Sequence, residues 1–263
     1  MKAAEFFFAN PVFRHEEFLA ACYPGVGKDC RAAERVLAHH VSVGRVQRIR
    51  RGLYMVNDPR AAVSTFHVAA KLAPDAVLAY HTALEYAGHA YSLWHERLIM
   101  TSTQIRAFEF QNCRFRSVGI PAALGTESSR SLGVETHEHA GLKIRVTSLE
   151  RTLVDMLDRP EYSGGWEELW HCFEGVGFVD PHIILQHVRN LGSRTTAARV
   201  GWFIEQHRDR WLISDDLLGE LEELRPQVPV YIERSQRRQG ELHPRWNLMI
   251  PASVSTRQWA VVL

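Results

Sequence analysis

At 263 residues, the chain exceeds the ~100–200 residues of a typical single domain, so we expect two domains. Its hydrophobic residues (46%) and charged residues (23%) are balanced as in globular proteins with a sizeable core. The net charge of +1 argues against a basic coat protein. The sequence contains neither a run of ~18 apolar residues nor a signal peptide, which predicts a cytoplasmic protein without membrane association. Its cysteines lack CxxC or metal-finger spacing, so we expect reduced, mostly buried thiols at Cys22, Cys30, Cys113 and Cys172.

The N-terminal residues predict two helices joined by a turn. Phe13 to Cys22 has apolar side chains at helical spacing, and Tyr23–Lys28 is rich in the turn residues proline and glycine. Asp29 is the expected N-cap of a helix over residues 31–43, which Gly44 ends. A third helix has to come from residues 1–11 or from later in the chain.

The helix of residues 31–43 separates into two faces when its residues are plotted at ~100° intervals. The face expected to pack on the core consists of Ala32, Ala33, Val36, Leu37, His40 and Val43. The mostly basic opposite face consists of Arg31, Arg35, Ala38, Ser42 and Glu34, with His39 at its edge. Next come a strand around Val46 and Ile49, a tight turn at Gly52 and a strand over residues 53–56. A basic helix followed by a basic two-stranded ribbon predicts the recognition helix and wing of a winged helix-turn-helix.

The charge distribution supports a nucleic-acid partner for this segment. Residues 1–56 contain nine Lys or Arg against five Asp or Glu, whereas the remaining 207 residues contain 22 against 25. This excess predicts binding of double-stranded DNA, while a solvated helix and an ordinary hairpin are the alternative interpretation. The side chains expected to approach base edges are Arg31, Arg35, His39 and Ser42. Those expected to contact phosphates are Lys28, Arg45, Arg48, Arg50 and Arg51.

The rest of the chain predicts a larger α+β domain. We expect residues 1–60 to form the DNA-binding domain, residues 61–92 to form connecting helices (61–72 and 77–88), and residues 93–263 to form the C-terminal domain. Alternation with a period of two predicts strands over 97–101, 107–110, 113–118, 134–139 and 142–146. Helical spacing then predicts helices over 148–157, 165–175, 181–190, 194–209 and 214–223. Strands could return at 229–233 and around Leu248. This order favours an α+β fold over a regularly alternating α/β fold.

The predicted helix after Thr147 holds the candidate functional residues of this domain. Thr147 and Glu150 match a capping box, and the core stripe consists of Leu149, Leu153, Met156 and Leu157. Arg151 and Asp155 lie one turn apart on the other face, where a surface pair contributes only ~0.5 kcal/mol. A structural clamp between helix and sheet is the preferred interpretation. Arg151 and Asp155, with Arg159, are nevertheless candidate functional residues.

Three segments of the chain resemble the AbiEi antitoxins. They are Val146 to Trp170, which contains Glu-Arg-Thr-Leu-Val-Asp; Tyr80 to Gly88; and the basic ribbon ending Arg-Arg-Gly-Leu-Tyr. The resemblance spans roughly residues 13–225 in the expected order. It implies a winged helix-turn-helix that binds the operon's own promoter, at repeated or inverted sites. It also implies a C-terminal domain that counters a nucleotidyltransferase toxin of the AbiEii type, which a neighbouring gene encodes. Toxin and antitoxin of such abortive-infection phage-defence systems are not expected to form a tight complex.

Other sites have less support. His137 and His139 could face one metal ion from a strand, but we find no third ligand at a useful spacing, so we expect no metal and no cofactor. A nuclease delivered to DNA by the winged helix is one competing hypothesis, although the sequence lacks a carboxylate followed by x-Lys on a strand. It also lacks a Gly-x-Ser-x-Gly motif and a complete phosphate-binding loop, so we expect no enzyme.

Two further alternatives remain open. The chain could be a protein-interaction module whose basic ribbon binds an acidic partner rather than DNA. The tail of residues 230–263 resembles nothing that we can name, and its cluster of Arg234, Arg237 and Arg238 is either a solvated loop or a second DNA contact.

Overall fold

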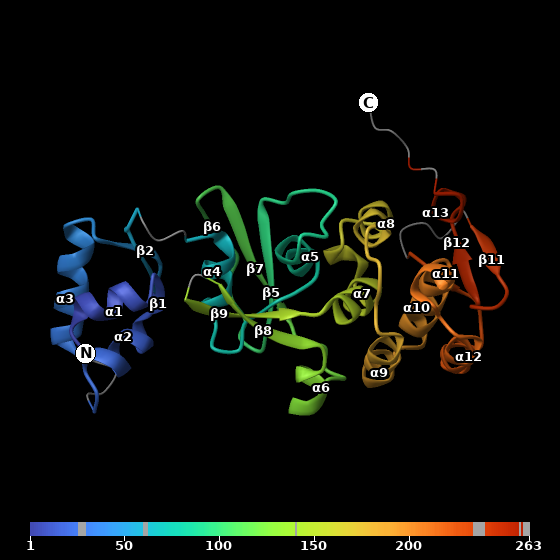
Figure 1. The fold of residues 1–263 in the computed structure, drawn as a ribbon, viewed down its shortest axis with the longest axis horizontal. Helices are drawn as coiled ribbons and strands as arrows, with labels where there is room; N and C mark the ends of the chain where they lie inside the picture. Colours follow the sequence, from blue (N-terminus) through green and yellow to red (C-terminus); the bar gives the residue numbers. More distant parts are fainter. Residues whose placement is uncertain (26–29, 60–62, 140, 234–239, 258, 260–263) are drawn as a thin grey trace. The chain divides into compact units, whose positions relative to one another are not determined.

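A computed structural model describes residues 1–263 except 26–29, 60–62, 140, 234–239, 258 and 260–263 (Figure 1). The chain divides into two compact units. Unit 1 comprises residues 1–78, 95–119 and 136–146, and unit 2 comprises residues 79–94, 120–135 and 147–263. Mixed α and β structure is found in the described parts of the chain. None of the described helices is long and apolar enough to cross a membrane.

Unit 1 begins with helices and a small antiparallel sheet. In chain order the elements are α1 (Ala3–Ala9), β1 (Val12–Arg14), α2 (His15–Cys22), α3 (Arg31–Ser42), β2 (Val46–Arg50) and β3 (Leu53–Val56). The strand order is β1-β3-β2, and β3 pairs antiparallel with both neighbours. Helix α1 supplies the third helix that the sequence left unassigned. Phenylalanine rings fill the centre, where Phe6 packs edge-on against Phe13 and Phe18 at 5.2 and 5.4 Å between ring centroids.

The prediction of a helix from Phe13 was wrong at its start. Phe13 lies in β1 opposite Tyr54 of β3, and their rings stack at 5.6 Å. Helix α2 begins only at His15. The apolar spacing fits both structures, but pairing with β3 satisfies the backbone groups of residues 12–14 within the ladder.

The second part of unit 1 consists of α4 (Thr65–Ala70) and most of the larger sheet. Its strands are β4 (Val77–Leu78), β5 (Glu96–Thr101), β6 (Phe108–Phe110), β7 (Cys113–Gly119), β8 (Val134–His139) and β9 (Leu142–Thr147), in the order β6-β7-β5-β4-β9-β8. Strands β5 and β7 run parallel, whereas β6 and β7 form an antiparallel hairpin. Gln111 and Asn112 turn that hairpin with φ values of 50° and 57°, as a two-residue turn with both φ positive requires.

The predicted helix of residues 77–88 is divided in the structure. Val77 and Leu78 form β4, which pairs with β5 and β9. Only α5 (His81–Ala87) is helical, and Gly88 ends it in the left-handed conformation. A short run of buried apolar residues fits a central strand as well as a helix, and here the two neighbouring strands decide the outcome.

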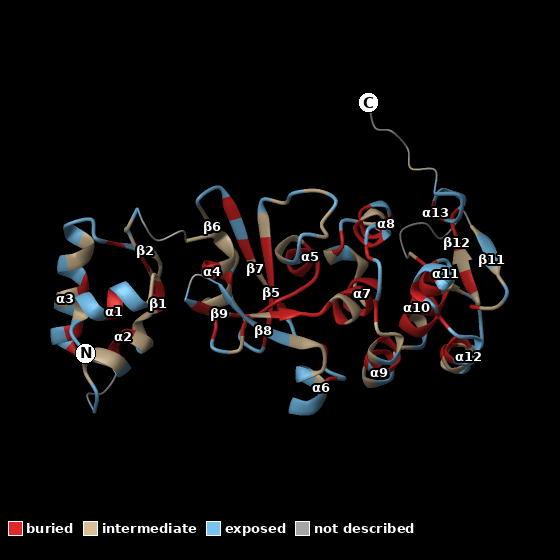
Figure 2. Cartoon of the chain, in the orientation of Figure 1, coloured by how far each residue is buried: buried red, intermediate tan, exposed pale blue. Residues whose placement is uncertain are grey.

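Unit 2 is mainly helical. Its helices after α5 are α6 (Glu127–Ser131), α7 (Leu149–Asp158), the 3-10 turn η1 (Pro160–Tyr162), α8 (Trp166–Glu174), α9 (Pro181–Leu191), α10 (Arg194–Glu205), α11 (Arg208–Trp211), α12 (Asp215–Glu223) and α13 (Ala252–Ser255). Buried residues run along most of α7 and α10 (Figure 2). The predicted helix 194–209 is interrupted at residues 206–207, where α10 ends and α11 starts.

The C-terminal residues return as a small sheet, as the sequence suggested. Strands β10 (Val230–Tyr231), β11 (Glu241–His243) and β12 (Leu248–Ile250) have the order β10-β12-β11. Trp246, fully buried, lies against Gly201 of α10 and donates from Nε1 to Glu205 Oε2 at 2.6 Å. The segment between β11 and β12 is therefore attached to α10 by the indole ring of Trp246 and by Arg245, whose Nη1 donates to Glu205 Oε1 at 2.6 Å.

Candidate functional site

Helix α3 presents a basic face to solvent. Arg31, Arg35, His39 and Ser42 are all exposed, while Ala33 and Leu37 are buried on the other side. Arg35 Nε donates to the Arg31 carbonyl oxygen at 3.3 Å, so this side chain lies back along the helix. The structure thus brings the four predicted base-contacting side chains onto one exposed surface. The expected core face is narrower than predicted, because Ala32 and Val43 are exposed.

His40 lies on the inner side of α3, as its helical position predicted. Its ring is half-buried and contacts Phe7 edge-on at 4.9 Å between centroids. Burial, together with the nearby His39 and Arg45, lowers the pKa of His40. A neutral His40 therefore belongs to the packing of unit 1, whereas its neighbour His39 faces solvent.

The ribbon β2–β3 carries the expected phosphate-contacting arginines in two different environments. Arg45, Arg48 and Arg51 are exposed. Arg50 is half-buried, and its guanidinium carbon lies 4.9 Å from the centroid of the Phe108 ring, within cation–π range. We therefore expect Arg50 to contribute less to a charged interface than the other three. Lys28 lies outside the described residues.

The tip of the ribbon is short and anchored. Gly52 turns the chain with a φ of 79°, which favours glycine, and its carbonyl oxygen accepts a hydrogen bond from the His15 backbone N–H at 2.8 Å. This bond ties the turn to the start of α2. The exposed arginines of the ribbon are thus held at a defined position relative to α2.

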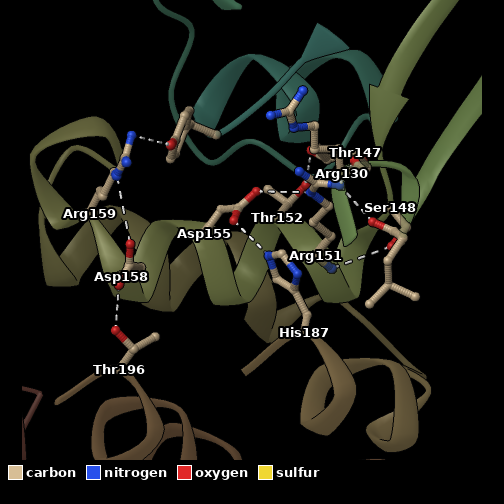
Figure 3. A network of polar contacts seen from close by, with 12 residues as sticks. Arg130, Thr147, Ser148, Arg151, Thr152, Asp155, Asp158, Arg159, His187 and Thr196 are labelled. Carbon is tan, nitrogen blue, oxygen red and sulfur yellow. Dashed lines mark hydrogen bonds and ion pairs between the residues drawn. The ribbon is translucent and has the colours of Figure 1, made fainter. Parts of the chain in front are cut away.

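The candidate residues of α7 form a buried network rather than a surface pair (Figure 3). Arg151 and Asp155 are each about 1% exposed, and Arg151 Nε donates to Asp155 Oδ2 at 3.3 Å. Arg151 Nη1 also donates to the carbonyl oxygens of Arg130 and, at 2.7 Å, Leu132. Asp155 Oδ1 accepts from Nε2 of the buried His187 on α9 at 2.8 Å. The network joins α7 to α9 and to the end of α6, so these contacts form a clamp between helices and not the predicted clamp between helix and sheet.

The electrostatics of Asp155 follow from these contacts. Burial alone would raise the pKa of the carboxyl group. The hydrogen bond and charge of His187, with the guanidinium of Arg151, outweigh burial and hold the pKa of Asp155 below its ordinary value. A carboxylate cannot donate, so the Nε2 atom of His187 carries the proton of this hydrogen bond.

The third candidate, Arg159, follows α7 and is half-buried. Its Nε lies 3.7 Å from Asp158 Oδ2, and its Nη1 donates to the Tyr80 hydroxyl at 3.4 Å. Asp158 Oδ1 also accepts a hydrogen bond from Thr196 of α10 (Figure 3). Arg159 is therefore part of the packing of unit 2 and not of a separate surface.

The predicted capping box at Thr147 and Glu150 was wrong. Ser148 is the N-cap of α7, and its Oγ accepts from the Arg151 backbone N–H. Glu150 Oε1 instead accepts from the Asp180 backbone N–H at 3.1 Å, before α9. The helix begins one residue later than the box required, because β9 extends through Thr147.

Two histidine sites were missed by the sequence analysis. His139 Nδ1 lies 2.8 Å from Nε2 of the buried His67, to which the sequence offers no link. His67 Nδ1 accepts from the Ser64 backbone N–H, so its proton resides on Nε2. The second site joins His81, Glu168 and Cys172, which are all buried. Partners separated by 72 and 87 residues cannot be recognised by spacing.

A polar cavity of about 990 Å³ lies in unit 2 between the end of α7, the start of α10 and β10. Its lining includes the carboxylates of Asp158, Glu161 and Glu233 and the guanidinium of Arg199. Arg199 Nη1 already donates to the Leu157 carbonyl oxygen at 2.9 Å. The negative excess of this cavity makes it a poor site for a nucleic-acid phosphate.

Comparison with solved structures finds a protein with a similar fold. The crystal structure of the RV2827C protein from Mycobacterium tuberculosis aligns with a TM-score of 0.56 and 14% sequence identity. The alignment covers 91% of this chain and 86% of that chain. At this level of identity the likeness concerns the fold alone. No protein-family model and no curated protein matches the chain.

Proposed function

We propose that residues 1–60 form a winged helix-turn-helix that binds double-stranded DNA, and that the chain is a transcriptional repressor of its own operon. The observation that carries the proposal is the basic exposed face of α3, which holds Arg31 and Arg35. The order α1-β1-α2-α3-β2-β3, with β3 between β1 and β2, supports it. A helix followed by a ribbon suits a major groove and the adjacent phosphates.

The two parts of the surface have different expected roles. Side chains of α3 read base edges, so their loss affects the preferred sequence most. Arginines of the ribbon contact phosphates, which every sequence offers equally. Neutralising about five phosphates gives a log–log dependence of affinity on salt with a slope of about −4 to −5.

Replacing Arg35 with alanine tests the role of α3. We expect Arg35→Ala to weaken binding to the protein's own upstream DNA by about 1–3 kcal/mol and to leave binding to a scrambled duplex nearly unchanged. Fluorescence anisotropy with both duplexes at two salt concentrations measures this difference. An equal loss on both duplexes would refute the assignment of α3 as the recognition helix.

Arg48→Ala is the matched control, since this side chain is also an exposed arginine of unit 1. It should weaken binding to both duplexes alike and reduce the salt slope by about 1. If the wild-type protein shows no salt-sensitive DNA binding at all, the alternative of a protein-interaction module is favoured. If metal-dependent cleavage of the duplex is observed, the nuclease hypothesis is favoured instead.

We further propose that the C-terminal domain counters a nucleotidyltransferase toxin encoded beside the chain. The support is the resemblance of residues 80–88 and 146–170 to AbiEi antitoxins. In the structure these residues include the buried network of Arg151 and Asp155, which positions neighbouring elements and presents no charged surface of its own.

Co-expression with the neighbouring toxin tests this second role. If repression and antitoxin activity reside in different domains, Arg31→Ala/Arg35→Ala will lose operator binding and still restore growth. We expect no stable complex on size-exclusion chromatography, as the resemblance implies. Failure of the wild-type protein to restore growth would contradict the antitoxin proposal but would not contradict the proposal that residues 1–60 bind DNA.

A further inference from the structure

One group of buried side chains in unit 2 combines three different metal-ligand chemistries. His81 is the first residue of α5, and Glu168 and Cys172 lie one turn apart on α8. Their ligand atoms (an imidazole nitrogen, a carboxylate oxygen and a thiol sulfur) all lie within 4.8 Å of one another. No other group of three such residues is found in the part of the chain that the structure describes.

The surroundings hold each of these side chains in place. The Trp94 ring stacks on the His81 imidazole with 3.8 Å between centroids. Ser92 donates to Glu168 from both its backbone N–H, at 2.9 Å, and its hydroxyl, at 2.7 Å. Side chains fixed by neighbouring contacts are what a metal site needs before the ion binds.

The sulfur of Cys172 accepts a hydrogen bond from the Tyr91 backbone N–H at 3.3 Å. A thiol is a weak acceptor, whereas a thiolate accepts such a bond strongly. The Tyr91 N–H thus favours the thiolate form of Cys172, which is the form that binds a metal ion.

A second carboxylate lies behind the histidine. Glu168 Oε1 lies 2.9 Å from His81 Nε2. The other ring nitrogen, Nδ1, lies 3.9 Å from Glu85 Oε2. In zinc sites, the histidine nitrogen that does not bind the metal commonly donates to a carboxylate. With its proton on Nδ1, His81 would present a lone pair at Nε2 to an ion.

We propose that His81, Glu168 and Cys172 bind one zinc ion that links α5 to α8. The mixture of nitrogen, oxygen and sulfur ligands fits Zn²⁺, whereas Ca²⁺ and Mg²⁺ require oxygen ligands. Binding moves the His81 proton from Nε2 to Nδ1 and releases the Cys172 thiol proton to solvent. These three protein ligands leave the fourth position of a tetrahedral ion to a water molecule. Because the ion would link α5 to α8, it stabilises unit 2, and the proposal does not depend on DNA binding.

The competing explanation is a metal-free network in which His81 and Cys172 both donate to the Glu168 carboxylate. The distances of 2.9 and 3.4 Å to Glu168 Oε1 suit that network as well. The two explanations differ in one measurable property. Only a metal site produces a cysteine thiolate bonded to an ion at neutral pH.

Cobalt substitution of the full-length protein distinguishes them. We expect one Co²⁺ per chain, with visible d–d bands and a near-ultraviolet thiolate-to-cobalt charge-transfer band, and we expect Zn²⁺ to displace it. Cys172→Ala should abolish the charge-transfer band. Cys113→Ala, which removes another buried cysteine, should retain it. A wild-type protein without this band, or a band that survives in Cys172→Ala, would overturn the proposal.

Glu85→Gln provides a second variant that leaves all three proposed ligands intact. Loss of a carboxylate behind a metal-bound histidine weakens metal affinity by ~10–100-fold, so we expect a shift of that size in competition with a chromophoric chelator. Unchanged affinity would contradict the assignment of Glu85 as the carboxylate that orients the metal-bound His81. Far-ultraviolet circular dichroism of each variant confirms that unit 2 remains folded during these measurements.

Discussion

Asp155→Asn is expected to lower the free energy of unfolding of unit 2 by about 3–5 kcal/mol, because it removes one charge from a buried pair and leaves the other uncompensated. Asparagine keeps the shape of the side chain and can still accept from His187 Nε2. The guanidinium of Arg151, about 1% exposed, then has no carboxylate to balance it. For a domain of this size the melting temperature should fall by roughly 6–20 °C.

Urea unfolding followed by tryptophan fluorescence measures this effect selectively, since all seven tryptophans belong to unit 2. Asp209→Asn is the matched control. Asp209 is exposed on α11, and its replacement should change the free energy of unfolding by no more than about 0.5 kcal/mol. Similar losses for the two variants would show that the buried network contributes no specific stability.

The pH dependence of the difference in free energy of unfolding between wild type and Asp155→Asn supplies a second test. The folded-state pKa of Asp155 lies below its unfolded value of about 3.9. Its contribution to stability is therefore complete above that value and is lost as the pH falls through the folded pKa. The difference in free energy of unfolding between wild type and Asp155→Asn should be constant from about pH 5 to pH 8 and should become smaller below about pH 4. A difference that becomes smaller towards alkaline pH instead would contradict the lowered pKa of Asp155 in the folded protein.

Local patterns predicted the elements whose structure depends mainly on their own residues. The amphipathic spacing of residues 31–43 and the glycines at 44 and 52 predicted α3 and the β2–β3 ribbon. Gln111 and Asn112 predicted the hairpin turn between β6 and β7, and Asn112 belongs to the few residue types that adopt positive φ readily. Helix α9 begins at Pro181, where the sequence placed it.

Features that depend on distant partners could not be predicted in the same way. The length of β4 is set by its neighbours β5 and β9, and the burial of Arg151 by the segment after α6 and by α9. The spacing of Glu168 and Cys172 was visible in the sequence, but His81, 87 residues from Glu168, was not an evident companion. Charge patterns similarly located an exposed face on α3 without distinguishing Arg50, which lies over a ring of the larger sheet.

Gly201→Ala is expected to destabilise unit 2 by about 1–3 kcal/mol or more, although alanine is the better helix former. A Cβ atom at this position of α10 would overlap the indole ring of the fully buried Trp246. Trp246 also carries the hydrogen bond to Glu205, so its displacement loosens the sheet of β10, β11 and β12. Gly219→Ala in α12 is the matched control, since a Cβ there meets nothing within 4 Å. It should be stabilising by up to about 1 kcal/mol.

A double-mutant cycle separates the clash from any other effect of residue 201. Trp246→Ala should cost about 3–5 kcal/mol by itself through the lost indole packing. In that background the obstacle is gone, so Gly201→Ala should become neutral or stabilising by up to about 1 kcal/mol, as at Gly219. The sign of the effect therefore reverses with the residue at position 246. A loss of the same size in both backgrounds would mean that the close approach of α10 to Trp246 does not attach the C-terminal sheet.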